Sequence, residues 1–233
     1  MTSLIATNFI TKNKTTVTFS ELLTSNDASK LLAELNDLLP SKIHKPYLDS
    51  SGNKVFDFND LKLLADEHKA TEALIPLFNR LFADQQVQLV RGEHEPEYFP
   101  AYNGNPARIE FAHGFFASAL HEISHWCIAG KARRQLSDFG YWYAADGRNE
   151  AQQRAFERVE IKPQALECLF TLACNRPFQV SQDNLFADFD TSDSSFAYDV
   201  YEQAKAYIAN PQSLPRDAQT LLRAFLTLFN EHS

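Results

Sequence analysis

Apolar residues recur at helical spacing along most of this chain, and that pattern predicts a mainly helical protein. In the first part, a polar cap at residues 25–27 precedes an apolar face that ends before Pro40. From residue 71 the pattern strengthens. Further helices are predicted over residues 71–82, 112–132, 151–160, 163–174, 199–209 and 218–229. The segment from Pro163 continues the helix before it or starts a new one, and Pro163 suits the first turn of a new helix, where its missing N–H has no helical partner.

Two short stretches have the character of β-strands. Residues 87–90 alternate and are rich in valine, and residues 108–111 form a second β-prone run. The segment between them, residues 93–106, contains three prolines and the turn signal Asn103-Gly104-Asn105, so we predict a loop there. The predicted fold class is therefore α+β, a helix-rich single domain with a small β-sheet and a candidate metal site on its central helix.

The amino-acid composition of the chain changes gradually near residue 70. Residues 1–70 are richer in Ser, Thr, Asn, Asp and Lys, and residues 49–53 have the composition of a turn. We interpret residues 1–70 as an N-terminal extension or small subdomain and residues 71–233 as the domain that carries the chemistry.

Charge and cysteine content exclude several classes of protein. The formal net charge is −8, which disfavours binding of nucleic acid through bulk charge and suits a cationic substrate or a basic partner. The three cysteines, Cys127, Cys168 and Cys174, show no CxxC spacing, so we expect small buried residues in a reducing compartment rather than disulfides or a thiolate zinc site. No secretory signal and no membrane-spanning run is evident, so we expect a cytoplasmic protein that makes no use of a membrane.

The candidate chemistry lies in the predicted helix 112–132, in the motif His121-Glu122-Ile123-Ser124-His125. Residues four apart on a helix lie one above the other on the same face, so His121 and His125 can bind one metal ion together. The flanking residues Phe115, Phe116, Ala119, Leu120, Ile123 and Trp126 can bury the other faces of that helix.

Two histidines do not complete a metal site, and a third ligand has to come from elsewhere. Four residues are candidates on sequence alone: Glu160, Glu167, His113 and Asp138. Glu160 stands between two β-branched residues, where a metal ion would compensate the desolvation of its carboxylate. Glu167 is the runner-up ligand or a partner of a ligand, and His113 can lie at the edge of the site.

The motif is compatible with two reaction classes. Two histidines and one carboxylate with open coordination positions occur in non-haem iron oxygenases, whereas in zinc peptidases the Glu of the same motif, here Glu122, is the general base. A third interpretation, a metal-stabilised binding module, needs a closed site, and no fourth protein ligand is evident.

Several strings of this sequence resemble the bacterial elongation factor P hydroxylase family. They are residues 111–115, 119–134, 138–143, 146–148 and 159–166, together with Glu95-Pro96. The resemblance covers roughly residues 72–210 and leaves the first 70 residues outside it.

This resemblance implies an activity and a ligand set. Members hydroxylate the modified lysine of the translation factor after a β-lysyl group has been attached to it, which is the last step of its maturation. They have a compact α+β fold similar to that of a metal-dependent endoribonuclease. The family's ligand glutamate falls in the string Glu-x-Lys-Pro-Gln, so the implied ligands are His121, His125 and Glu160.

The implied reaction also specifies cofactors and a partner. Hydroxylation of an unactivated C–H bond needs a redox metal and dioxygen, so Fe(II) is expected rather than zinc. Elongation factor P is the implied protein substrate, and residues 71–233 are the implied metal-dependent hydroxylase domain. Glu122 becomes a candidate for supporting a ligand or handling protons, and Tyr141, Trp142 and Tyr143 are candidate walls of a lysine channel.

Overall fold

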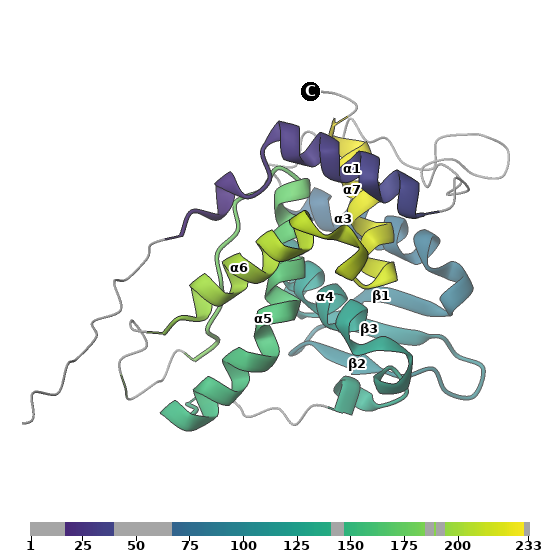
Figure 1. The fold of residues 1–233 in the computed structure, drawn as a ribbon. Helices are drawn as coiled ribbons and strands as arrows, with labels where there is room; N and C mark the ends of the chain where they lie inside the picture. Colours follow the sequence, from purple (N-terminus) through teal and green to yellow (C-terminus); the bar gives the residue numbers. More distant parts are fainter. Residues whose placement is uncertain (1–16, 40–66, 141–146, 185–188, 190–193, 231–233) are drawn as a thin grey trace, which may run out of the picture.

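The protein is described here by a computed structural model that covers residues 17–39, 67–140, 147–184, 189 and 194–230 (Figure 1). The described elements, in chain order, are η1 (Phe19–Glu21), α1 (Ser25–Leu38), α3 (Glu67–Leu81), η2 (Ala83–Gln85), β1 (Val87–Arg91), β2 (Glu97–Phe99), β3 (Ala107–Phe111), η3 (Ala112–Gly114), α4 (Phe116–Arg133), η4 (Ser137–Gly140), α5 (Glu150–Ala173), α6 (Phe196–Ala209), η5 (Pro211–Ser213) and α7 (Arg216–Asn230). The helix-rich α+β class predicted from the sequence is confirmed.

Helix α4 is central to the arrangement, because it packs against β3 on one side and against α5 on the other. Helix α3 covers β1, and α5 also contacts α6 and α7 (Figure 1). At the far end of α4, Arg134 forms an ion pair of 2.7 Å with Asp217 of α7, and its guanidinium group lies 3.5 Å from the centre of the Trp126 ring. Among the described residues, no helix is long and apolar enough to cross a membrane.

The sheet has three strands in the order β1-β3-β2. Strand β1 pairs with β3 in parallel, with Leu89 opposite Ile109, and β2 pairs with β3 antiparallel, with Tyr98 opposite Ile109. Both strands predicted from the sequence are present. The prediction of a continuous loop over residues 93–106 is wrong at β2, because this three-residue strand is held by two contacts with residues outside the segment. One is the β3 ladder, and another is the Asp138 carboxylate, which accepts the Tyr98 N–H at 2.9 Å.

The sequence left open whether the chain continues or restarts a helix at Pro163, and helix α5 shows that it continues. It runs without interruption from Glu150 to Ala173, so Pro163 lies inside a helix and not in the first turn of a new one. A proline here removes one hydrogen bond, to the carbonyl of Val159. The residues that follow it are buried, among them Leu166, and their packing keeps the two halves in one helix. Figure 1 shows α5 changing direction between these halves, as expected at an internal proline.

The starts of several helices also differ from their predicted positions. Helix α1 is capped by Thr24 in a reciprocal capping box with Asp27, and α3 begins earlier than residue 71. The predicted start of the central helix at residue 112 is a 3-10 turn instead, because His113 (φ 51°) and Gly114 (φ 77°) take the left-handed conformation. The predicted turn at residues 49–53 and the aromatic residues 141–143 lie outside the described residues.

Helix α1 packs on α7. Its residues Leu31 and Leu35 are part of the same buried core as the apolar residues of α4 and of the helices around it. The three cysteines are free and buried, as expected from the sequence, and burial raises the pKa of each thiol.

We expect Leu35→Ala to lower the free energy of unfolding by about 2–5 kcal/mol, because it leaves a cavity between α1 and α7 at a side chain with no exposed surface. Urea unfolding measures this change. Asn36→Ala, an exposed neighbour on the same helix, is the matched control and should change stability by less than about 0.5 kcal/mol. Equal effects of the two variants would show that α1 is not part of the cooperative core.

Candidate metal centre

Helix α4 presents its two motif histidines toward α5 because its other faces are buried. Leu120, Ile123 and Trp126 are almost completely inaccessible to solvent. The spacing of four residues then places the rings of His121 and His125 next to one another, with centroids 4.7 Å apart. The N-terminus of this helix is fixed from outside, since the Glu67 carboxylate accepts the Phe116 N–H at 2.7 Å.

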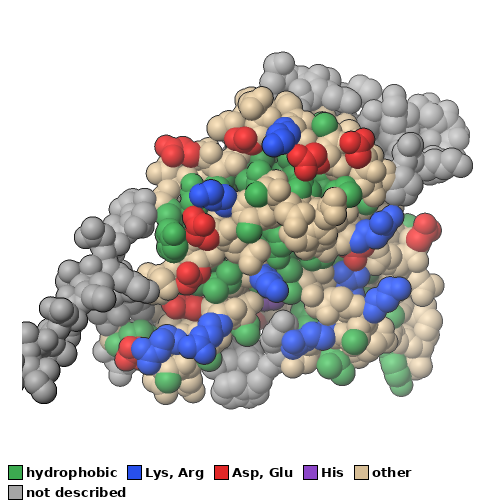
Figure 2. Space-filling view, viewed as in Figure 1, with side chains coloured by type: hydrophobic (Ala, Val, Ile, Leu, Met, Phe, Trp, Pro, Cys, Tyr) green, Lys and Arg blue, Asp and Glu red, His purple; other side chains and the backbone are tan. Residues whose placement is uncertain are grey.

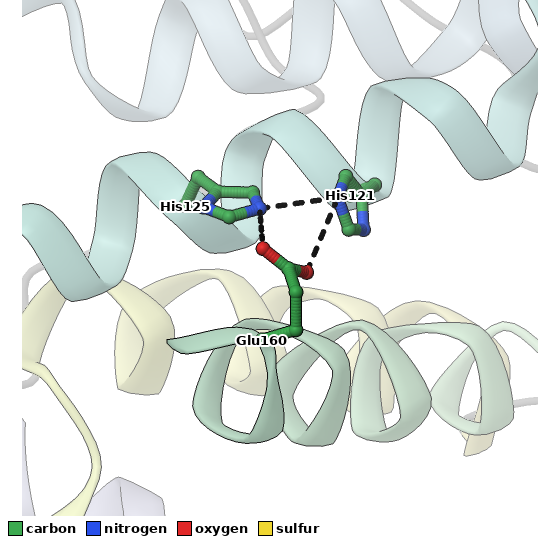
Figure 3. A group of neighbouring side chains, drawn as sticks. All are labelled: His121, His125 and Glu160. Carbon is green, nitrogen blue, oxygen red and sulfur yellow. Dashed lines mark hydrogen bonds and ion pairs between the residues drawn. The ribbon is translucent and has the colours of Figure 1, made fainter. Parts of the chain in front are cut away.

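Helix α5 supplies the carboxylate that faces these rings (Figure 3). Glu160 Oε1 lies 3.2 Å from His125 Nε2, and Glu160 Oε2 lies 3.7 Å from His121 Nε2. The two Nε2 atoms are themselves 3.1 Å apart. Among the described residues, these three side chains form the one group of histidine, cysteine and carboxylate side chains whose ligand atoms lie close enough together for a metal ion.

Glu167 occupies a different place from Glu160. Its Oε2 atom lies 2.8 Å from Nδ1 of His121, the ring nitrogen that points away from His125 and Glu160. If Nδ1 donates its proton to this carboxylate, the lone pair of His121 is left on Nε2, where the other two donors converge. This is the arrangement in which an outer carboxylate orients a metal-binding histidine.

The two other candidates from the sequence lie elsewhere. His113 is exposed in the turn before α4, and its ring lies against that of Phe115, with a centroid distance of 6.1 Å. Asp138 accepts the Tyr98 N–H and so fastens β2. Neither belongs to the group formed by His121, His125 and Glu160.

The electrostatics of the group are those of a buried, strongly coupled cluster. Burial alone would raise the pKa of Glu160, but the charges of His125 and His121 and a hydrogen bond from Gln164 outweigh it and lower that pKa. For His121, burial alone would lower the pKa, and the hydrogen bond and charge of Glu167, with the charge of Glu160, raise it to about 10. Without a metal ion, this cluster therefore retains protons that a cation would replace.

Glu122 lies beside the group and does not join it. Its side chain is partly buried, and desolvation raises the pKa of its carboxyl, against the lowering influence of His121 and His125. In the part of the chain that the structure describes, its carboxylate makes no hydrogen bond.

The three donors fit a divalent transition metal in both chemistry and spacing. Ligand atoms about 2.1 Å from one ion are roughly 3.0 Å apart at right angles and roughly 3.4 Å apart in a tetrahedron. The separations of 3.1 Å between the two Nε2 atoms and 3.2 Å between His125 Nε2 and Glu160 Oε1 lie between these values. The separation of 3.7 Å between His121 Nε2 and the other carboxylate oxygen, Oε2, is slightly longer. The side chains of His121 and His125 are 27 % and 16 % exposed, so solvent reaches the histidine side of the group, and a closed four-ligand site is not formed by the described residues.

Fold and site together define a helix-rich α+β protein with a partly open candidate centre of two histidines and one carboxylate. Comparison with known proteins gives the family. The family model described as elongation factor P hydroxylase matches residues 77–233, and the chain belongs to this family. The chain is also 47 % identical over 167 residues to a Haemophilus influenzae protein named elongation factor P lysine hydroxylase, across 70 % of this chain and 91 % of that protein.

Two contributors to the site were not singled out from the sequence. Gln164 donates a hydrogen bond to Glu160, and the Ser181 backbone holds Gln164 in turn. The position of Gln164 four residues after Glu160 is a signal that could have identified it, because it shares the same helix face. The contact with Ser181 has no signature in the sequence.

We expect His121→Ala, His125→Ala and Glu160→Ala each to abolish tight metal binding while the fold survives, because each removes one of three convergent donors. Equilibrium dialysis with Co(II) or Fe(II), followed by metal analysis, measures occupancy, and circular dichroism checks the fold. Glu167→Ala is expected to weaken binding about 10- to 100-fold without abolishing it, as for other partners of ligands. Full occupancy in Glu160→Ala together with loss in Glu167→Ala would assign the third ligand to Glu167 instead.

Proposed function

We propose that this protein hydroxylates the β-lysylated lysine of elongation factor P, as the last step in the maturation of that translation factor. Membership of the elongation factor P hydroxylase family supports this proposal, as does the 47 % identity to a protein named elongation factor P lysine hydroxylase. The substrate is a cytoplasmic translation factor, so we place the reaction in the cytoplasm.

The observation that carries the proposal is the convergence of His121, His125 and Glu160 at one point between α4 and α5 (Figure 3). We propose that these three side chains hold one Fe(II) ion. Bound there, iron would supply the redox chemistry with dioxygen that insertion of oxygen into an aliphatic C–H bond requires. Zinc has no redox chemistry and would not serve.

The protein's own residues would bind the metal ion, orient its ligands and leave one side of the centre accessible to substrate. Glu160 supplies a buried anionic donor, and the two imidazoles supply neutral donors. Glu167 holds His121 with Nε2 directed at the centre. The partial exposure of both histidines provides the side from which a lysine side chain can approach.

We propose Glu122 as the residue that handles protons beside the centre. It is next to His121 in sequence, and its carboxyl interacts electrostatically with His121, His125 and Glu160. Hydroxylation consumes dioxygen, two electrons and two protons, and releases water. A carboxylate without a hydrogen-bond partner in the described part of the chain is free to bind a proton or the substrate ammonium group.

A zinc-dependent hydrolase would use the same three ligands with Glu122 as general base. The hydrolase is not favoured, because a relative that is 47 % identical to this chain is named a lysine hydroxylase. The metal that supports activity separates the two: iron with dioxygen for the hydroxylase, and zinc alone for the hydrolase.

We expect β-lysylated elongation factor P to gain the mass of one oxygen atom when it is incubated with this protein, Fe(II), ascorbate as reductant, and air. Intact-mass spectrometry of the substrate measures the gain. His121→Ala and an anaerobic incubation are the controls, and both should show no gain. A protein that is folded and loaded with iron yet leaves the substrate mass unchanged in air would refute the proposed activity.

We expect Glu122→Gln to retain the metal and to lower the rate of hydroxylation by about 10²- to 10⁴-fold, the usual range for loss of a proton-transfer group. Rates come from the same mass assay, and occupancy comes from metal analysis. Glu150→Gln is the matched control, since Glu150 is an exposed carboxylate that pairs with Arg154 on α5. Loss of metal from Glu122→Gln would instead make Glu122 part of the binding site, and an unchanged rate would remove its catalytic role.

A further inference from the structure

We infer that Gln164 is a positioning residue for Glu160, and that the backbone of Ser181 holds Gln164 in the orientation this task requires. The inference rests on the metal site of the proposed function. It adds that the loop after α5 determines how the carboxylate ligand Glu160 is held.

Both the nitrogen and the oxygen of the Gln164 side-chain amide are hydrogen-bonded to the backbone of one residue, Ser181. Its Nε2 donates to the Ser181 carbonyl at 2.7 Å, and its Oε1 accepts the Ser181 N–H at 3.0 Å. A backbone N–H can only donate and a carbonyl can only accept, so this pair of bonds determines which end of the amide is nitrogen. Gln164 is 1 % exposed, so no solvent competes for these bonds.

The fixed amide has one remaining N–H, and it is directed at Glu160. Gln164 Nε2 lies 3.5 Å from Glu160 Oε2, the oxygen on the His121 side of the carboxylate. The other oxygen, Oε1, is on the His125 side. A donor held on one oxygen restricts rotation of the carboxylate, so both oxygens stay turned toward the histidines. The same donor offsets part of the cost of burying this charge.

A second buried glutamine on α5, Gln153, provides a control that distinguishes a positioning role of Gln164 from a merely structural one. Gln153 is as buried as Gln164, and it also fastens the loop after α5, donating to the Gln182 carbonyl at 2.9 Å. Its further partners are Arg148 and Glu157. Gln153 thus makes a comparable attachment to the same loop, and its bonds go to none of the three proposed ligands.

The test compares Gln164→Met with Gln153→Met, because methionine keeps the length and volume of glutamine and removes its hydrogen bonds. Co(II) affinity is measured by titration, the coordination environment by the visible absorption of bound Co(II), and the fold by thermal unfolding. We expect both variants to lose stability. Only Gln164→Met should bind Co(II) about 10- to 100-fold more weakly and with altered absorption bands. Gln153→Met should keep the wild-type affinity and spectrum.

Equal losses of affinity in the two variants, or wild-type affinity in a folded Gln164→Met, would overturn the inference. If Gln164→Met does not fold, Gln164→Asn decides the question in the same way. Asparagine keeps the amide, but it is one methylene too short to reach both Ser181 and Glu160. A wild-type protein that binds no Co(II) at all would contradict the proposed metal site itself, and with it this inference. Binding that is unaffected by position 164 contradicts the positioning role alone.

Discussion

The arrangement of the candidate metal centre depends on one electrostatic constraint, the burial of the Glu160 carboxylate against two imidazoles. Removing an ionised carboxylate from water is costly unless cations or hydrogen bonds compensate it. Glu160 is 3 % exposed, and its compensation comes from His121 and His125 on α4 and from Gln164 on its own helix. The close packing of α4 on α5 is therefore a requirement of the site as well as a consequence of apolar burial.

Continuity of α5 matters for the same reason. Glu160, Gln164 and Glu167 are spaced at four and three residues, which places them on one face of a helix. Pro163 falls within this run, and a helix that ended there would have separated the carboxylate from the two residues after it. The buried second half of α5 holds the helix together across the proline, at the loss of one hydrogen bond. The bend in Figure 1 is the visible result.

The sequence revealed those parts of the site that are local and left open those that depend on packing. His121 and His125 share a helix turn, so their spacing alone predicts that they lie together. Glu160 and Glu167 are both on α5, and spacing could not choose between them. The family resemblance favoured Glu160, and the structure separates the two by the nitrogen each approaches, Nε2 or Nδ1 of His121. Strand β2 was missed because it has only three residues in a segment rich in proline, and one of its partners, Asp138, lies 40 residues further along the chain.

The distribution of exposure around the site indicates from which side a substrate would reach it. The carboxylate is at the buried side, and the two imidazoles are at the side that solvent reaches. Helix α5 provides the proposed ligand Glu160 and also Gln164, which contacts Glu160, and Glu167, which contacts His121. Helix α4 provides the two accessible imidazole rings. A side chain entering from solvent then meets the histidine side first, with Glu122 of α4 partly buried beside it. The contacts that hold the proposed ligands come from α5, and the solvent-accessible imidazoles come from α4. The two requirements are compatible because different helices meet them.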